Sequence, residues 1–548
     1  MGKRCSLLCF GVRKIHKSAW LLVLLSAGLQ ILIFPLPNLY MLSWCALAPL
    51  LIALLRARQP DTLQFQDGIK LLPATPWQGF LLAYVCGILW YAGNCYWIYG
   101  TMHRYGGVNA PGALGILILF CLYLALYHGL FGLLVSLLSG RKSVNRFALL
   151  LVPAVWVTAE LARTRITGFP WDLLGVTQVD NIALARIATV TGVYGLSFEI
   201  MVVNAALAGA FLVRRERRKQ LLLATLGAAL VLQATRWVNP PALPTDRTAV
   251  LLQPNIPILT DADWTREFFD ETLRDMSTVS LDAELQTGST NAPAQPRPNL
   301  IVWPESPAPF FDNDADYRTR VSNLAREAQT WVLVGTVGTT GPPYQATSPI
   351  YNSGALISPS GEWTARYNKV HLVPFGEYLP FPRLFSFAGG LTQQVGNFTA
   401  GREYKPLDAG GTELGVFICY ESIFPNEVRQ FAANGAQVLV NLSDDVWYGD
   451  SGAYAQHLRQ ARMRAVENNR WLLHDTNTGV TASIDPYGRL VASLPRKERA
   501  ALRAPYALSN VTTFYTRHGD WFAYLCAIIS LMALSMRLPF RKKAERKA

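Results

Sequence analysis

The chain has 548 residues, of which 51% are hydrophobic and 16% are charged, and its formal net charge is +13. The charged fraction is well below the ~25% of an average soluble protein, which excludes a disordered chain and argues against a wholly soluble one. Residues 1–237 and 521–548 together carry 27 Lys/Arg and 8 Asp/Glu, whereas residues 238–520 carry 23 Lys/Arg and 29 Asp/Glu. The positive charge therefore belongs to an apolar part of the chain, and we expect no nucleic-acid partner.

Eight apolar segments in the basic part have lengths equal or close to what a ~30 Å hydrocarbon layer requires. The first two are separated by only residues 35–38, and no small-x-small cleavage site follows the first. We therefore interpret the first segment as a membrane span, although its basic N-terminal flank also fits a cleaved signal peptide. The eight predicted spans are Ala19–Phe34, Leu39–Leu55, Gly79–Ile98, Pro111–Leu138, Phe147–Ala162, Gly192–Val213, Gln220–Thr235 and Trp521–Met536.

Basic residues are concentrated on alternate sides of these segments, as expected when cytoplasmic loops carry the Lys/Arg excess. With the N-terminus inside, the cytoplasmic segments carry 22 Lys/Arg, and the short outer loops carry only Arg104, Arg163, Arg165 and Arg186. This pattern predicts eight spans with both termini in the cytoplasm. The long segment between the seventh and eighth spans is then on the outer side of the membrane.

The outer segment alternates short β-rich runs with amphipathic helical patterns, such as 316–329 and 453–469, which is typical of α/β layers. Pro-X-Gly turns at 358–361 and 485–488 predict two hairpins. We predict a membrane domain with seven helices over 1–237, an extracytoplasmic α/β domain over 238–515, and an eighth helix with a basic cytoplasmic tail over 516–548. The predicted strands are Ala249–Gln253, Asn299–Val302, Trp331–Val337, Ser353–Ser358, Gly415–Cys419 and Gln437–Leu442.

Three residues of the outer segment lie where an α/β fold displays reactive groups, at the end of a strand. Cys419 ends the apolar run 415–418, Glu305 follows a strand by one residue past a proline, and Lys369 lies among aromatic and apolar residues. Each of them alone would fit a structural or surface role, but together they predict a catalytic site. No zinc-spaced Cys/His cluster and no Gly-rich phosphate loop occurs, so we expect neither a metal nor a cofactor.

The sequences around these residues are Trp-Pro-Glu-Ser at 303–306, Tyr-Asn-Lys-Val-His-Leu-Val-Pro-Phe-Gly-Glu at 367–377, and Ile-Cys-Tyr-Glu at 418–421. They resemble the three signatures of the nitrilase superfamily. Together with the eight apolar segments, they are most similar to its apolipoprotein N-acyltransferase branch, which completes lipoprotein maturation in bacteria. The resemblance implies an αββα sandwich. It also implies a multi-pass protein of the bacterial inner membrane whose catalytic domain is periplasmic, and we expect a monomer.

The resemblance also implies roles for individual residues. Glu305 would be the general base, Lys369 its electrostatic partner and Cys419 the nucleophile. Glu377 and Glu421 match further acidic positions around the site, while Asp444 stands where the family pattern leads us to expect Asn. Four aromatic residues match positions that are linked to lipid access or loop closure: Trp171, Trp264, Tyr420 and Trp447.

The reaction implied by the resemblance is a ping-pong acyl transfer through a thioester on Cys419. The donor would be a phospholipid, and the acceptor the α-amino group of the diacylglyceryl-cysteine at a lipoprotein N-terminus. We expect the apolar segment Phe381–Leu391 and Trp447 to keep water from the thioester. A membrane-tethered amidase or nitrilase with the same triad is the alternative. A transporter is disfavoured because Glu160 and Glu199 are the only acidic residues within the predicted spans.

Overall fold

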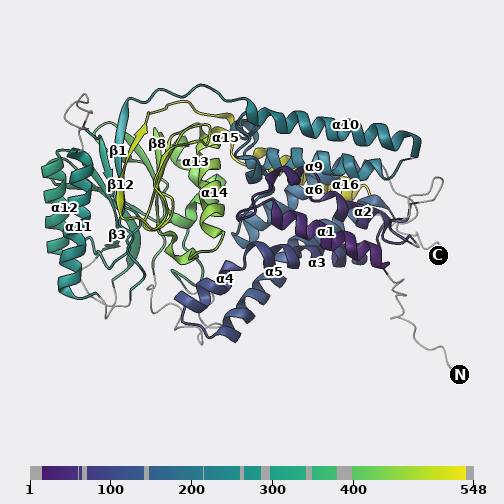
Figure 1. Cartoon of the computed structure of the whole chain (residues 1–548), viewed down its shortest axis with the longest axis horizontal. Helices are drawn as coiled ribbons and strands as arrows, with labels where there is room; N and C mark the ends of the chain where they lie inside the picture. Colours follow the sequence, from purple (N-terminus) through teal and green to yellow (C-terminus); the bar gives the residue numbers. More distant parts are fainter. Residues whose placement is uncertain are drawn as a thin grey trace, which may run out of the picture.

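A computed structural model describes residues 15–59, 61–63, 71–140, 147–213, 215–259, 264–285, 297–340, 348–378 and 398–537. The chain forms a helical bundle that lies beside a sandwich of two β-sheets (Figure 1). Across Figure 1 the layers run from α11 (Arg266–Leu285) and α12 (Ala315–Ala328), through the two sheets, to α13 (Pro425–Ala433) and α14 (Ala453–Asn468). The bundle packs against this last helical layer.

Eight helices form most of the bundle, and every predicted apolar segment falls on one of them. They are α1 (Lys17–Leu32), α2 (Ala48–Arg56), α3 (Pro76–Asn94), α5 (Ala110–Ser139), α6 (Phe147–Ala162), α9 (Val193–Ala210), α10 (Arg215–Ala234) and α16 (Trp521–Ser535). Short elements connect or extend them: α4 (Trp97–Gly100), α7 (Ile182–Ala185), α8 (Ala188–Thr191), α15 (Phe514–His518), π-helical turns at Thr101–Tyr105 and Arg163–Thr167, and 3₁₀ turns at Tyr40–Trp44, Leu174–Gln178 and Thr235–Trp237.

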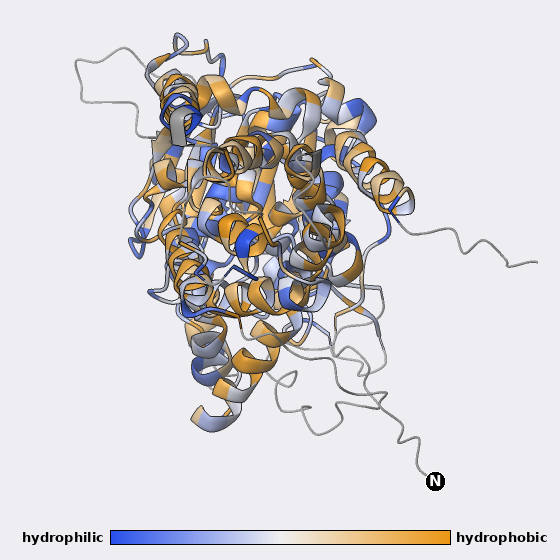
Figure 2. Ribbon diagram, turned by 90° about the vertical axis from the view of Figure 1, so that its right-hand side faces the viewer, coloured by the Kyte–Doolittle hydropathy of each residue, from blue (hydrophilic) through white to orange (hydrophobic). Residues whose placement is uncertain are grey.

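The helices differ in how well they match the thickness of a membrane. Among the described residues, α5 and α9 are long and apolar enough to cross one, and α3 becomes a third when it is joined to Trp97–Tyr105 across a bend of 52°. The α1 and α16 helices are apolar but shorter. The structure therefore contains two or three candidate spans, and the prediction of eight is not confirmed. In Figure 2, which faces the bundle, much of the helical ribbon has the colour of hydrophobic residues.

Two predicted spans are not single α-helices. The segment predicted over Gly79–Ile98 breaks after Asn94, and the one predicted over Leu39–Leu55 consists of a 3₁₀ turn followed by α2. Hydropathy is averaged over a window, so a break of one or two residues between apolar runs does not change the prediction.

Each sheet has six strands, in the orders β12-β1-β2-β3-β4-β5 and β11-β10-β9-β8-β7-β6. The pairs among β1, β2 and β3 and among β7, β8 and β9 are parallel, and the other pairs are antiparallel. The strands are β1 (Arg247–Gln253), β2 (Leu300–Val302), β3 (Trp331–Thr339), β4 (Ile350–Ile357), β5 (Trp363–Asn368), β6 (Leu407–Asp408), β7 (Glu413–Ile418), β8 (Val438–Ser443), β9 (Leu472–Thr476), β10 (Ala482–Ile484), β11 (Leu490–Ser493) and β12 (Ala500–Tyr506).

The six predicted strands are confirmed, and so are the two predicted hairpins, which join β4 to β5 and β10 to β11. Alternate side chains of β1 enter different cores. Leu251 belongs to the same buried cluster as Val416 and Leu442 of the second sheet, whereas Val250 belongs to the cluster that contains Leu324 of α12. Because both sheets are covered on their outer faces by helices, the predicted αββα sandwich is confirmed.

The bundle and the sandwich share a continuous hydrophobic core. Tyr420, Phe424 and Val466 of the sandwich belong to the same buried cluster as the bundle helices. Trp171, which is fully buried, donates a hydrogen bond of 2.8 Å from Nε1 to Gln456 Oε1 on α14. The bundle therefore fixes the position of α14, the helix that covers the second sheet next to the predicted nucleophile.

Candidate active site

The three residues predicted to catalyse the reaction lie at the carboxyl ends of three strands. Lys369 directly follows β5, Cys419 directly follows β7, and Glu305 lies three residues beyond β2. All three are buried: the exposed fraction is 1% for Lys369, 7% for Cys419 and 9% for Glu305. Strands from both sheets thus bring together residues that are up to 114 positions apart in the sequence.

Cys419 is the first residue after β7, and it begins a 3₁₀ helix over Cys419–Ile423, so the chain turns sharply at this residue. Its φ angle is +47°, in the left-handed region that non-glycine residues rarely adopt. Such strain is retained where the surrounding structure imposes it, often at functional sites. Burial raises the pKa of the Cys419 thiol well above its usual value, Glu305 raises it further, and Lys369 opposes this shift. The thiol therefore needs a nearby base to become a nucleophile.

Lys369 connects two carboxylates. Its Nζ lies 2.9 Å from Glu377 Oε1 and 3.4 Å from Glu305 Oε1. Burial alone would lower the pKa of Lys369, but Glu377, Glu305 and Cys419 together raise it above its ordinary value. The ammonium group is therefore charged at neutral pH and provides a fixed positive charge beside Cys419.

Asn352 on β4 is a residue of the site that sequence reasoning missed. Its side-chain amide donates hydrogen bonds of 2.6 Å to both Glu305 Oε1 and Glu377 Oε1. The second oxygen of Glu305 accepts a hydrogen bond of 2.9 Å from the backbone N–H of Asp444. These donors hold two carboxylates close to one ammonium group. No sequence signal marked it, because the predicted strand began at Ser353, one residue later, whereas β4 begins at Ile350.

Glu421 ties the turn over Cys419–Ile423, named the nucleophile turn after the predicted role of Cys419, to the loop that begins at Lys369. Its Oε1 accepts hydrogen bonds from the Tyr367 hydroxyl and from the backbone N–H groups of Val370 and His371. Its Oε2 accepts one of 2.7 Å from the backbone N–H of Ile418. Because Glu421 holds the residues next to Lys369 and next to Cys419, it fixes the distance between them without contacting the reacting atoms.

Three of the four predicted aromatic residues lie where the sandwich meets the bundle. The Tyr420 hydroxyl donates to the carbonyl oxygen of Gly168 at 3.2 Å. The Trp447 carbonyl accepts from the Thr101 hydroxyl at 2.9 Å, and Trp171 contacts α14. Trp264 instead packs against Phe310 on the outer face of the first sheet. The predicted water-excluding segment Phe381–Leu391 is outside the described residues.

A second buried cluster lies behind Cys419 and comprises Asp445, His457 and His474. One ligating atom from each lies within 4.8 Å of the others, and among the described residues no other such group has the composition of a metal site. Sequence reasoning did not find this cluster, because its members come from a 3₁₀ turn, from α14 and from β9.

Comparisons with known proteins match both parts of the chain. A model of the carbon-nitrogen hydrolase family matches residues 271–514, and one of the apolipoprotein N-acyltransferase N-terminal domain matches residues 26–207. The apolipoprotein N-acyltransferase of Geobacter metallireducens is 34% identical over 544 residues, which cover 97% of each chain. That of Methylococcus capsulatus is 36% identical and covers 83% of this chain and 87% of its own. A solved carbon-nitrogen hydrolase from Helicobacter pylori covers 52% of this chain and 92% of its own, at 16% identity and a TM-score of 0.34.

Proposed function

The chain belongs to the apolipoprotein N-acyltransferase family, and from this premise we propose that it carries an acyl chain from a phospholipid to the N-terminal amino group of diacylated lipoproteins. The enzyme class follows from its relatives, which are named apolipoprotein N-acyltransferases over most of the chain. The observation that supports the mechanism is the buried group of Glu305, Lys369 and Cys419 beside a membrane bundle. The proposal has two half-reactions.

In the first half-reaction, Glu305 accepts the thiol proton and the Cys419 sulfur attacks the ester carbonyl of the phospholipid. The ester C–O bond breaks, Glu305 returns the proton to the leaving oxygen, and a lysophospholipid departs from a thioester on Cys419. Lys369 and the backbone N–H of Tyr420 would stabilise the oxyanion, a type of contact worth about 3 kcal/mol each. The positive charge of Lys369 also favours the thiolate form.

In the second half-reaction, the α-amino group of the lipoprotein attacks the thioester carbonyl. Glu305 accepts a proton from this amine, an amide bond forms, and the thiol leaves with the proton. Both substrates are held in the membrane by their acyl chains. This explains why the nucleophile turn faces the bundle through Tyr420 and Gly168.

We also propose that the bundle crosses the inner membrane eight times, with both termini in the cytoplasm and the sandwich in the periplasm, as a monomer. The support for the topology is the alternation of basic residues along the chain and the location of every apolar segment on a bundle helix. A reporter fused after residue 548 that is active only in the cytoplasm should be active. A reporter that requires export should be active when it is fused at residue 240.

The decisive experiment uses the full chain in bilayers with a phospholipid whose acyl chain is isotopically labelled. We expect labelled Cys419 in the absence of an acceptor, and a third, labelled acyl chain on the lipoprotein N-terminus when the acceptor is added. The C419A variant should show neither product. Free labelled fatty acid as the only product would identify a hydrolase with the same triad, and a third acyl chain formed by C419A would contradict the proposal.

A further inference from the structure

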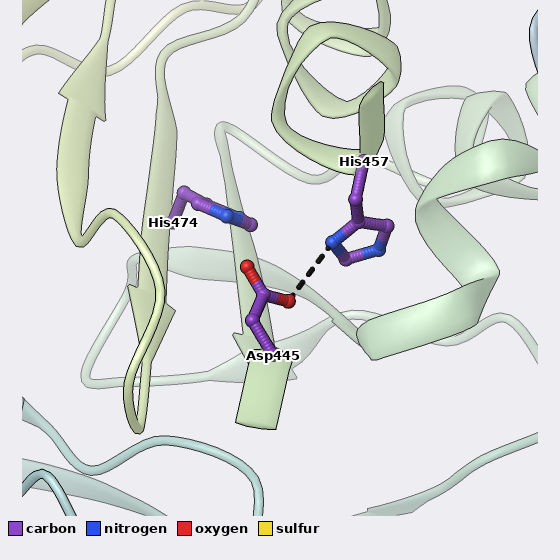
Figure 3. Close-up of side chains that lie close together, drawn as sticks. All are labelled: Asp445, His457 and His474. Atoms are coloured by element: carbon purple, nitrogen blue, oxygen red, sulfur yellow. Dashed lines mark ion pairs between the residues drawn. The ribbon is translucent and has the colours of Figure 1, made fainter. Parts of the chain in front are cut away.

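His457 lies directly behind the nucleophile, and its ring is completely buried. It contacts the turn that begins at Cys419 and the 3₁₀ turn over Asp445–Tyr448. Its Nε2 lies 3.0 Å from the carbonyl oxygen of Cys419 and 2.8 Å from Ser422 Oγ. Its Nδ1 forms an ion pair of 3.2 Å with Asp445 Oδ1 (Figure 3). The imidazole therefore bridges the nucleophile backbone and a buried carboxylate.

The partners of this ring define where its protons are. The Cys419 carbonyl and the Asp445 carboxylate only accept hydrogen bonds, and each faces a different ring nitrogen. The Ser422 hydroxyl can donate or accept a hydrogen bond, so it is compatible with His457 Nε2 either with or without a proton. Both nitrogens must carry a proton for the two contacts to be attractive, and the ring is then a buried cation paired with Asp445.

The third member of the cluster is a neutral ring. His474 Nδ1 lies 2.8 Å from Asn441 Oδ1, and the amide nitrogen of Asn441 donates to the carbonyl oxygen of Phe417 at 3.2 Å. This arrangement orients the amide so that its oxygen accepts from His474 Nδ1–H. Burial lowers the pKa of His474 to about 4. The cluster therefore contains one cation, His457, and one anion, Asp445.

The charge of Asp445 matters for the nucleophile. Asp445 lies close enough to Cys419 to raise the pKa of its thiol, in the same direction as Glu305. An unpaired Asp445 would therefore oppose formation of the thiolate. The pKa of Asp445 itself is held below its usual value because His457, with help from Ser443 and His474, outweighs the effect of burial. His457 thus cancels a negative charge that the fold places behind the sulfur.

We propose that His457 is a positioning residue for catalysis: its doubly protonated ring holds the carbonyl of Cys419 in the strained turn and neutralises Asp445 behind the nucleophile. This inference rests on the proposed role of Cys419 as the nucleophile. His457 acts through the backbone and the local charge and does not contact the reacting atoms. Its position is also set by the bundle, because the Trp171 ring lies parallel to it, with the ring centroids 6.2 Å apart.

A metal ion is the other cation that could occupy such a cluster. One ligating atom from each of the three residues lies within 4.8 Å of the others. His457 Nδ1 lies 3.2 Å from Asp445 Oδ1 as an ion pair and forms no hydrogen bond. An imidazolium satisfies this contact by charge alone, and the metal content of the purified chain is one readout of the test.

The test measures the alkylation rate of Cys419 against pH in the full chain in nanodiscs, with quantification of the Cys419 peptide by mass spectrometry. The other groups that face the sulfur or the ring are Glu305, Lys369, Tyr448 and His474, and all stay unchanged. The variants are H457Q, D445N and the double variant. The control is H518Q, which makes the same substitution at an exposed histidine.

We expect H457Q, but neither D445N nor the double variant, to raise the pH midpoint of Cys419 alkylation. H457Q leaves Asp445 unpaired, so the midpoint of the alkylation profile should rise by about half a pH unit or more, and the rate at pH 7.5 should fall about threefold to tenfold. D445N and the double variant leave no unpaired negative charge behind the sulfur, so their midpoints should not rise above that of the unmodified chain, and that of H518Q should match it. Alkylation requires no lipid substrate, so failure of the proposed acyl transfer would not affect this readout.

Three outcomes would overturn the inference. The first is an unchanged midpoint for H457Q. The second is a shift in H457Q that the double variant does not reverse, which would indicate a purely structural role. The third is one bound divalent metal ion per chain that is lost in H457Q. If H457Q does not accumulate in folded form, D445N decides alone, because the proposal predicts no upward shift and a clear one would contradict it.

Discussion

The ammonium nitrogen of Lys369 lies 2.9 Å from Glu377 Oε1. This carboxylate is nearer to Lys369 than Glu305 is, at 2.9 Å against 3.4 Å, so Glu377 is the main partner of the ammonium group. In E377Q, Lys369 should move toward Glu305, its remaining carboxylate partner, and away from the position it holds beside Cys419. We expect kcat for acyl transfer to fall about tenfold to a hundredfold with a small change in KM. The exposed E403Q variant is the control, and an unchanged kcat in E377Q would contradict this role.

Asn352 separates the two carboxylates by donating to both, at 2.6 Å each. In N352A both carboxylates lose a buried donor, and we expect thioester formation to slow at least tenfold. In N352D a third negative charge would be added beside Glu305 and Glu377, so this variant should be slower than N352A although Asp is closer in shape to Asn. The rate of labelled thioester formation provides the measurement. The opposite order would show that Asn352 acts through packing alone.

The pKa of Glu421 is raised to about 7 because burial outweighs its four hydrogen-bond donors. An unfolded chain releases this proton near pH 4.5, so the folded state binds more protons between about pH 4.5 and 7, and stability should fall as the pH rises through this range. The stability advantage of the unmodified chain over E421Q should shrink by up to about 3 kcal/mol between pH 5 and 8. Unfolding midpoints at four pH values would measure this. Parallel curves for the two proteins would contradict it.

Asp180 forms ion pairs with Arg459 and Arg462 on α14. Both arginine side chains are largely buried, at 7% and 12% exposure, so removing their partner leaves uncompensated charges. We expect D180A to destabilise the protein by about 3 kcal/mol. The matched control is D450A, which breaks an exposed pair with Lys497 and should cost less than about 1 kcal/mol. Equal losses in the two variants, measured by unfolding in detergent, would rule out a special role for the contact between bundle and sandwich.

The three proposed catalytic residues could be located from the sequence because each lies in a short, distinctive run at the end of a strand. Cys419, Lys369 and Glu305 are followed or preceded by turns that sequence patterns reveal. Asn352 and His457 are brought to the same place from the middle of a strand and from a helix. Their roles depend on which elements become neighbours, and a pattern within one element does not contain this information.

The helix over 453–469 was predicted, but the environment of its polar side chains was not. Gln456, His457 and Gln460 are buried, although polar residues on a helix usually indicate a solvated face. Here that face packs against the bundle and the nucleophile turn. The strand β9 was missed for a related reason, because His474 and Asp475 interrupt the apolar run that identifies a buried strand.

The burial of α14 on nearly all sides has a consequence for how this protein can be divided. Of its 16 residues, 13 are buried. The outer side of this helix is therefore covered by the bundle, where a soluble hydrolase would expose it to water. Cutting the chain near residue 240 would expose Gln456, Arg459 and Met463 together with the back of the nucleophile turn. The sandwich expressed alone should therefore aggregate or lose the geometry of Cys419. Anchoring the enzyme to the membrane and completing its folded core are, for this chain, a single requirement.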